Sequence, residues 1–169
     1  GAIDTLSIAD SLAIKLNAQN YTVLLSCAAA MHSVTATRRV HHHMTSHLAT
    51  SKINAITVGA LTHSYAQCGD LATAVGVFEE GVGRGLQFDV TGWSVLIDAY
   101  AEHGMVDDAN RTLDRMVEAG VQPNEVTVTC MLNAASHCGL GAGVKHLLNQ
   151  LASRFPHIQP DIKHQCCVI

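Results

Sequence analysis

Aromatic residues are scarce in this chain, since Phe, Trp and Tyr make up only 4% of its 169 residues. The cores of β-sandwiches depend on aromatic and β-branched side chains, so this composition argues against such a fold. Hydrophobic residues nevertheless make up 48% of the sequence, enough to bury a core without disulfides or metals. Because Ala, Leu and Val predominate among them, we expect closely packed helices and an all-α protein.

The motifs of secreted and membrane proteins are also missing. None of the six cysteines forms a C-x-x-C pair, so we expect reduced thiols, most of them buried. Such thiols fit a cytosolic, nuclear or matrix-like compartment. No run of about 18 apolar residues is present, so membrane insertion is not expected. Because the chain begins with Gly1 rather than Met, we expect a processed or partial protein.

Signatures of catalysis and of cofactor binding are absent as well. The sequence has no H-E-x-x-H or G-x-S-x-G motif, and its glycine-rich stretches at residues 81–85 and 139–143 lack the pattern of a phosphate loop. His43 and His47 have the i, i+4 spacing of metal ligands, but no carboxylate or cysteine completes a set. The ending Cys166–Ile169 is formally a prenylation motif but follows no basic run. We predict no catalytic activity, no cofactor and no metal.

Positive charge is in short supply. Ten Lys and Arg against fourteen Asp and Glu give a formal net charge of −4, with eleven His treated as neutral. Neutralisation of phosphates usually supplies much of the affinity of a nucleic-acid-binding protein. Partial protonation of the histidines would shift the balance upward. The net charge is therefore unusual for a nucleic-acid-binding protein.

The sequence repeats itself at a fixed interval. Three similar six-residue segments end on glycines that are 35 residues apart: Ser64–Gly69, Ala99–Gly104 and Ala134–Gly139. Three further segments recur at nearly the same interval: Gly85–Asp89, Gly120–Asn124 and His157–Asp161. Two separate series in one register predict tandem structural repeats. The chain then divides into the end of a preceding repeat, four full repeats and the start of another: residues 1–17, 18–54, 55–89, 90–124, 125–161 and 162–169.

Each repeat has the pattern of a helical hairpin. Trp93, Leu96, Ile97, Tyr100 and Ala101 follow the i, i+3, i+4, i+7 spacing of one helical face. A second face follows: Ala109, Leu113 and Met116. Gly104 and Gly120 stand where a left-handed residue would close each helix, and Pro123 cannot continue the second one. A single hairpin leaves apolar surface exposed, so successive hairpins are expected to stack with their first helices along one surface.

Several segments carry a resemblance to a known family. Tyr65–Asp70, Trp93–Tyr100 and Val121–Thr127 resemble pentatricopeptide repeat motifs. Three more resemble the land-plant type with alternating repeat variants: Arg39–Met44, Leu132–Leu140 and Ile162–Ile169. The resemblance implies an α-solenoid of tandem helix-turn-helix repeats of about 35 residues. It also implies sequence-selective binding of single-stranded RNA in a mitochondrion or plastid, in RNA processing, editing, stability or translation.

Two other functions stay open. Trp93, Leu96 and Tyr100 also match the first helix of a tetratricopeptide repeat, a peptide-binding scaffold, but Ile97 takes the place of its close-packing glycine. The acidic net charge favours a structural role instead, in which the chain is a subunit of an organellar ribosome or another large assembly. Ribosomal RNA or proteins of that assembly would then be its partners.

The family resemblance implies which residues would read RNA bases. In that family one residue early in the first helix and the last residue of the repeat meet one base. The corresponding pairs are Thr22 with Asn54, Gly59 with Asp89, Ser94 with Asn124, and Thr129 with Asp161. The family's code implies adenine for the first and third pairs and guanine for the fourth. Gly59 offers no hydrogen bond, so its repeat is expected to be silent.

The second residue of each repeat would pack between neighbouring bases. Ile56 and Val126 suit such stacking, and Gln19 and Thr91 suit it less. The family also often has a lysine two residues before the turn glycine, near phosphate, and this sequence has none there: those places hold Ala30, Gln67, Glu102 and His137. The alternative for the polar residues is plain helix capping, because Asn, Asp, Ser and Thr favour helix starts in any protein.

Overall fold

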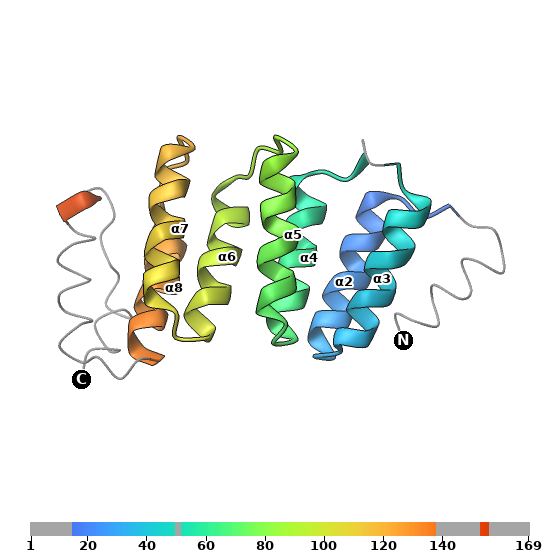
Figure 1. Cartoon of the computed structure of the whole chain (residues 1–169), viewed down its shortest axis with the longest axis horizontal. Helices are drawn as coiled ribbons and strands as arrows, with labels where there is room; N and C mark the ends of the chain where they lie inside the picture. The colour runs from blue at the N-terminus through green and yellow to red at the C-terminus, as the bar shows by residue number, and fades with distance from the viewer. Residues whose placement is uncertain (1–14, 50–51, 138–152, 156–169) are drawn as a thin grey trace. The chain divides into compact units, whose positions relative to one another are not determined.

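The computed structural model describes residues 15–49, 52–137 and 153–155, with the side chains of 134–137 left out. Residues 15–49 and 52–137 form seven α-helices of 13 or 14 residues, residues 153 and 154 are helical as well, and the described ranges contain no β-strand (Figure 1). The helices are α2 (Ala18–Ala30), α3 (Val34–His47), α4 (Ala55–Gln67), α5 (Leu71–Gly83), α6 (Val90–Glu102), α7 (Val106–Glu118) and α8 (Glu125–His137). None of the described helices has the length and apolar character needed to cross a membrane.

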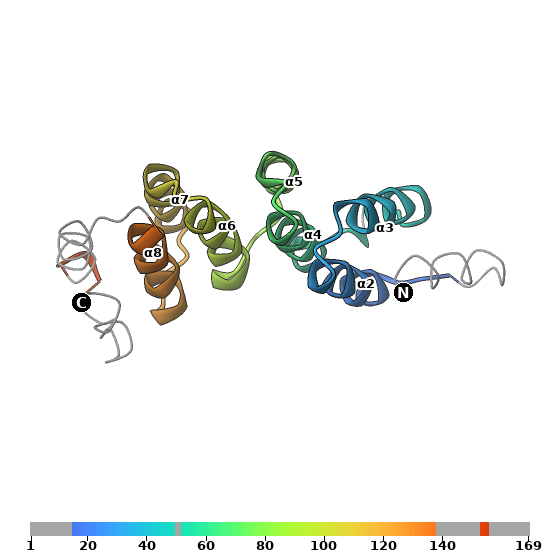
Figure 2. The same ribbon diagram turned by 90° about the horizontal axis from the view of Figure 1, so that it is seen from below.

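The chain divides into two compact units, Gly1–Phe88 and Asp89–Ile169. In the first unit α2 packs against both α3 and α4, and α4 packs in turn against α5. In the second unit α6 packs against α7 and α8, and α7 touches α8 (Figure 2). Within each unit, therefore, the leading first helix (α2 or α6) packs against the second helix of its own hairpin and against the first helix of the following hairpin. This is the stacking of helical hairpins that defines an α-solenoid, as the sequence predicts.

Glycines in a left-handed conformation close the hairpin turns. Gly69 has a φ of 77° and Gly104 a φ of 67°. Gly69 donates its backbone N–H to the carbonyl of Ala66 at 2.8 Å, and the next N–H, of Asp70, bonds Tyr65 at 3.0 Å. This pair of bonds is the Schellman arrangement, which satisfies carbonyls that the last helical turn would leave open. The predicted role of Gly104 is confirmed.

The turn between α2 and α3 uses a histidine in the same role. His32 has a φ of 46°, the one positive value at a non-glycine residue in the described part of the chain. Its N–H bonds the carbonyl of Ala29 at 2.9 Å, and its ring Nδ1 lies 2.8 Å from the carbonyl oxygen of Gln67. Because Nδ1 donates to that carbonyl, the side chain ties the turn of one hairpin to the end of α4, the first helix of the next.

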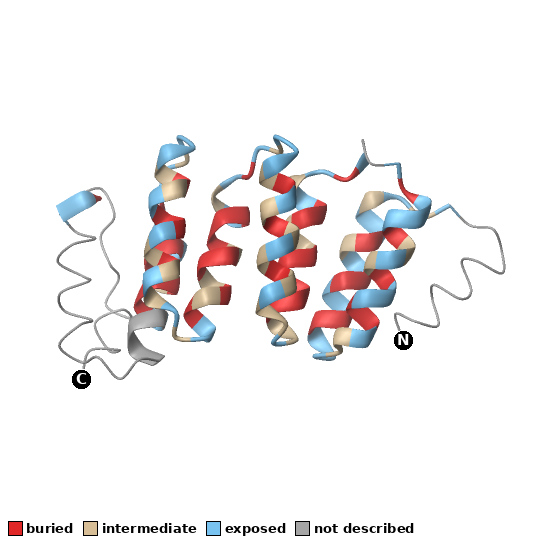
Figure 3. Ribbon diagram, in the orientation of Figure 1, coloured by how far each residue is buried: buried red, intermediate tan, exposed pale blue. Residues whose placement is uncertain are grey.

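The core follows the predicted helix faces. Trp93, Leu96, Ile97 and Ala101 are buried, and Tyr100 on the same face is half-buried. The predicted residues of α7 are buried as well: Ala109, Leu113 and Met116. Figure 3 shows buried residues along the helices of each unit, between exposed stretches. The helical period therefore predicts the core correctly in this hairpin.

The first helices begin at Ala18, Ala55, Val90 and Glu125. The division of the chain into repeats stays a prediction, because several of its parts fall outside the described residues. Those parts are residues 1–14, the segments 138–152 and 156–161 of the last full repeat, and 162–169. The glycine-rich stretch at 139–143 and the ending Cys166–Ile169 lie outside them too.

Candidate nucleic-acid interface

Three of the predicted base-reading residues cap the starts of first helices. The Oδ1 atom of Asn54 accepts the N–H of Thr57 at 3.0 Å, and that of Asn124 accepts the N–H of Thr127 at 3.2 Å. Asp89 accepts the N–H of Gly92 at 2.9 Å through Oδ1. All three caps are exposed. Since capping occupies Oδ1, each asparagine retains its NH₂ donors, whereas Asp89 retains its second carboxylate oxygen as an acceptor.

The hydroxyl residues of the predicted pairs already donate hydrogen bonds within the protein. Thr22 donates to the carbonyl of Gln19 at 2.7 Å, and Thr129 donates to that of Glu125 at 2.8 Å. A hydroxyl has one proton and two lone pairs, so the side chain of Thr22 retains acceptor capacity. Gly59 has no side chain, and a Cβ built there meets no atom within 4 Å. That position offers space and no hydrogen bond.

Only one predicted pair is joined by hydrogen bonds in the described part of the chain. Ser94 on α6 is 4% exposed, and its Oγ lies 3.0 Å from the Oγ1 of Thr127 on α8. The hydroxyl of Thr127 also donates to Oδ1 of Asn124 at 3.3 Å. Thr127 therefore bridges Ser94 and Asn124. Sequence reasoning missed Thr127, although it stands at the third helical position, where the reciprocal partner of a capping residue is found.

The other pairs differ in what the structure shows. Thr22 and Asn54 belong to the same unit, on α2 and at the start of α4, and no hydrogen bond joins them. Gly59 and Asp89 fall in different units. Asp161, the predicted partner of Thr129, lies outside the described residues. All of these positions remain predictions as base readers.

Apolar side chains stand exposed beside two of the caps. Ile56 is 73% exposed and Val126 is 58% exposed, each two residues after a capping asparagine. Apolar side chains are normally buried because burial favours folding. Exposed branched side chains at equivalent places therefore provide a surface on which a ligand with flat apolar faces can stack. Gln19 and Thr91, which hold this place in the other two repeats, are also exposed but polar. The prediction that Ile56 and Val126 stack on bases is compatible with these positions.

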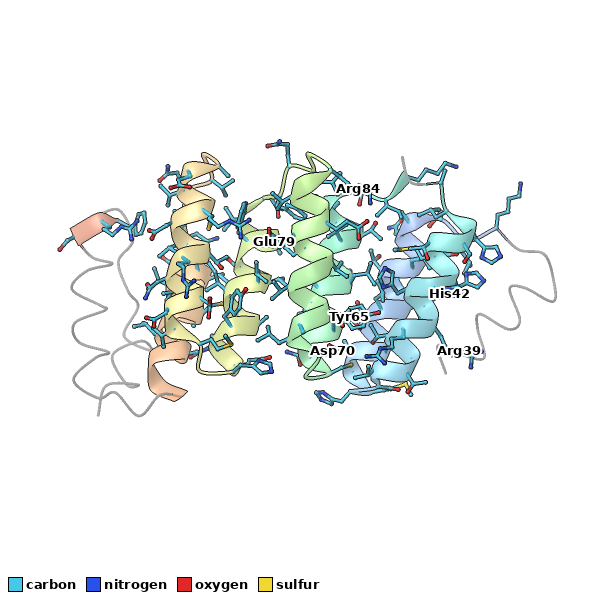
Figure 4. All side chains as sticks on the ribbon, in the orientation of Figure 1. Arg39, His42, Tyr65, Asp70, Glu79 and Arg84 are labelled. Atoms are coloured by element: carbon cyan, nitrogen blue, oxygen red, sulfur yellow. The ribbon has the colours of Figure 1, made fainter. Side chains whose placement is uncertain are left out.

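The first helices in the described part of the chain carry no lysine or arginine. The described helices α2, α4, α6 and α8 contain neither residue, and their acidic side chains are Asp98, Glu102 and Glu125. Positive charge is placed on second helices instead: Arg39 extends from α3 at the surface (Figure 4). Phosphate groups that approach the first helices would therefore meet no cationic side chain from those helices.

Two histidines of α3 lie within hydrogen-bonding distance of tyrosines on first helices. Nδ1 of His43 lies 2.8 Å from the Tyr21 hydroxyl, and Nδ1 of His41 lies 3.0 Å from the Tyr65 hydroxyl. Burial lowers the pKa of His41 below its usual value, although the nearby Glu80 carboxylate opposes the shift. The rings of His43 and His47 stack with centroids 4.1 Å apart. Among the described residues, no three metal-binding side chains gather into a group.

Comparison with known proteins gives consistent matches. A model described as "PPR repeat family" matches residues 88–137, and one described as "PPR repeat" matches residues 56–86. A pentatricopeptide repeat-containing protein of Arabidopsis thaliana is 29% identical over 99% of this chain and 23% of its own length. A chloroplastic one from the same plant is 34% identical over 65% of this chain and 14% of its own length. The chain thus spans about a quarter or less of these relatives.

Solved structures show the same fold. The pentatricopeptide repeat protein PPR10 in complex with an 18-nt psaJ RNA element superimposes with a TM-score of 0.79 at 22% identity, over 99% of this chain and 24% of that one. The corresponding domain of Arabidopsis thaliana protein-only RNase P 1, in complex with tRNA, gives a TM-score of 0.72 at 18% identity, over 99% of this chain and 86% of that one. At these identities the likeness concerns the fold.

Proposed function

Because the chain belongs to the pentatricopeptide repeat family, we propose that it binds single-stranded RNA and reads bases with paired side chains. Each pair joins a residue one turn into a first helix with the residue that caps the next first helix. Family membership decides against the tetratricopeptide alternative. The single observation that carries the proposal is the hydrogen-bond arrangement around Ser94 and Asn124, which leaves defined donors and acceptors for a base.

The arrangement has a fixed polarity. The carboxamide oxygen of Asn124 can only accept, so the hydroxyl of Thr127 donates to it, and Ser94 must donate to Thr127. The proton of Ser94 is then used, and its oxygen is left as an acceptor. Asn124 is left with its NH₂ donors, because its oxygen is already occupied by the backbone and hydroxyl of Thr127. The pair therefore offers one donor group, the NH₂ of Asn124, and one acceptor atom, the oxygen of Ser94.

This polarity selects between two classes of base. Adenine and cytosine have an unprotonated ring nitrogen at the centre of their pairing edge and an amino group beside it. They can accept from Asn124 and donate to Ser94. Guanine and uracil have a ring N–H at that place, which would face the amide donor without an acceptor. A well-matched pair of hydrogen bonds discriminates between bases by about 1–3 kcal/mol. Adenine is the member of the first class that the family resemblance implies.

The remaining pairs are assigned on the same principle. Thr22 donates its proton to the carbonyl of Gln19, and Asn54 caps α4 through Oδ1. This pair is therefore also proposed to accept adenine. Thr129 with Asp161 is proposed to accept guanine, because a carboxylate accepts where an amide donates. The repeat with Gly59 is proposed to tolerate any base. Ile56 and Val126 would stack between neighbouring bases.

We further propose an organellar role, in a plastid or a mitochondrion. The support is that two of the matched relatives carry the word chloroplastic in their names. Binding to an organellar transcript would affect its processing, editing, stability or translation. Four repeats at one base each specify only about four nucleotides, which is too few to select one transcript. The transcript would therefore be chosen with the help of further repeats or partners.

The test is a binding measurement with matched RNAs. One short RNA carries A, any base, A and G in the order of the repeats, in each of the two strand directions. The control RNA has its A and G exchanged. Fluorescence anisotropy at fixed, stated salt is expected to show at least about tenfold tighter binding to the matched RNA in one direction. Equal, weak binding to both RNAs in both directions would refute base reading.

A second candidate function is favoured by the charge of the first helices. Because α2, α4, α6 and α8, the first helices that the structure describes, carry acidic residues and no Lys or Arg, the same surface suits a protein partner in a large organellar assembly. In that case the chain would bind structured RNA through few contacts or none. The anisotropy experiment separates the two functions, since a protein-docking surface has no preference between the two RNAs.

A further inference from the structure

Thr127 occupies an unusual place for a helix-capping threonine. It is 0% exposed, so it cannot itself touch a base that lies on the surface. Its hydroxyl contacts both members of a proposed base-reading pair, at 3.0 Å from Ser94 and 3.3 Å from the Asn124 oxygen. The backbone N–H of Asn124 points to the same hydroxyl at 3.4 Å. Because this buried hydroxyl takes part in three hydrogen bonds, it cannot rotate without breaking at least one of them.

We propose that Thr127 is a positioning residue that sets the base preference of the Ser94/Asn124 pair by fixing which of their atoms donate and which accept. This inference rests on the proposed function. Without the hydroxyl of Thr127, Ser94 loses its partner and its proton can rotate toward a bound base. The amide of Asn124 keeps only the backbone N–H of residue 127 as a donor to Oδ1, so its orientation is less strongly held. Both changes weaken the distinction between adenine and guanine.

The first unit contains a natural control. Thr57 donates to Oδ1 of Asn54 at 3.0 Å, as Thr127 does to Asn124. Thr22, however, donates to the carbonyl of Gln19 in its own helix, and no hydrogen bond connects it to Thr57. Thr57 therefore acts only as a cap, whereas Thr127 connects the two reading side chains. Loss of the hydroxyl should have different consequences at the two positions.

The experiment compares Thr127→Val, Thr127→Ser and Thr57→Val in the full chain. Valine has nearly the shape of threonine, and serine keeps the hydroxyl. The ratio of affinities for adenine over guanine is measured at the nucleotide facing each pair. Thr127→Val is expected to lower the ratio about fivefold at its own nucleotide, the effect of one neutral hydrogen bond. Thr127→Ser should retain the ratio, and Thr57→Val should change the ratio at its own nucleotide by less than about twofold.

The outcomes separate this inference from the function on which it rests. A native protein without preference for adenine refutes the proposed function and this inference with it. A selective native protein whose preference survives Thr127→Val, or falls equally in Thr57→Val, overturns the inference alone. A measurement without RNA checks the bond itself: in a double-mutant cycle of Ser94→Ala and Thr127→Val, the unfolding equilibrium should be non-additive by about fivefold. Additive effects would overturn the connection.

Discussion

Cys130 shows how a single residue is changed by its neighbours. Its side chain is 8% exposed at the contact between α8 and α6. Burial raises the pKa of its thiol to about 12, and the Asp98 carboxylate adds to the shift by its charge and by accepting a hydrogen bond. The expectation that the cysteines are mostly buried holds for Cys130. It is wrong for Cys27, which is exposed, and Cys68 is half-buried.

The thiol of Cys130 should therefore resist alkylation. A pKa near 12 leaves about one thiol in ten thousand ionised at pH 8, and only the thiolate reacts. We expect iodoacetamide to modify Cys27 well before Cys130, as followed by mass spectrometry of proteolytic peptides. Asp98→Asn should lower the pKa of Cys130 and speed its reaction several-fold, while Cys27 reacts as before. Equal rates for the two cysteines in the native protein would contradict this assignment.

At the same scale, sequence alone identified the capping residues but missed their connections. Asn54, Asp89 and Asn124 are predicted as the last residues of their repeats, and each caps a helix. Thr127 was missed because its role depends on a contact with Ser94, which is 33 positions away in the chain. Periodicity within one helix contains no information about such a contact. Hydrogen bonds between neighbouring helices need coordinates.

At the scale of the elements, helix α5 shows how close packing limits which residue a position can hold. Gly81 is buried where α5 passes Phe88, whose ring stacks on Phe78 with centroids 4.4 Å apart. A Cβ at Gly81 would lie 2.8 Å from Phe88 Cζ and 3.1 Å from a methyl group of Val58. Gly76, on the same helix, is exposed, and a Cβ there meets nothing within 4 Å. The two glycines have the same helix propensity and opposite surroundings.

Alanine substitutions at these glycines should have opposite signs. Gly76→Ala is expected to stabilise the protein by up to about 1 kcal/mol, because alanine is a better helix former than glycine. Gly81→Ala gains the same propensity but overpacks a stacked aromatic pair, and we expect a net destabilisation of about 1–2 kcal/mol. Urea unfolding followed by circular dichroism measures both. A stabilised Gly81→Ala variant would show that Phe88 moves aside freely.

Helices and their turns are the part of this fold that sequence predicts best. The apolar period of 3.6 and the spaced glycines indicate α6, α7 and the turn at Gly104 directly. The turn at His32 could not be predicted in the same way. A left-handed histidine is rare, and its bond to the Gln67 carbonyl is made with a helix of the next hairpin. The conformation of this turn therefore depends on a tertiary contact, which the local sequence pattern does not reveal.

At the scale of the whole molecule, the distribution of charge determines how the proposed RNA binding should respond to salt. The net charge is −4, and the first helices in the described part contribute three acidic residues and neither Lys nor Arg. Proteins that neutralise phosphates release counterions, which makes binding weaker as salt rises. Binding carried by base edges and by stacking on Ile56 and Val126 has no such dependence. A protein-docking role predicts no preference between the matched and the exchanged RNA at any salt concentration.

Salt dependence is accordingly the most direct test of the binding mode. For single strands the slope of log K against log[salt] is about −0.7 for each phosphate contact, so three contacts would weaken binding roughly 20-fold between 50 and 200 mM salt. We expect less than about a twofold change for the matched RNA, measured by anisotropy. Glu102→Lys places a cation two residues before Gly104, where the family resemblance implies that a lysine can approach phosphate, and should steepen the slope by about 0.7. Glu118→Lys, at the end of α7, makes the same change in net charge on a second helix and should leave the slope unchanged. A steep slope in the native protein, or equal effects of the two lysines, would show that phosphates are bound elsewhere than along the first helices.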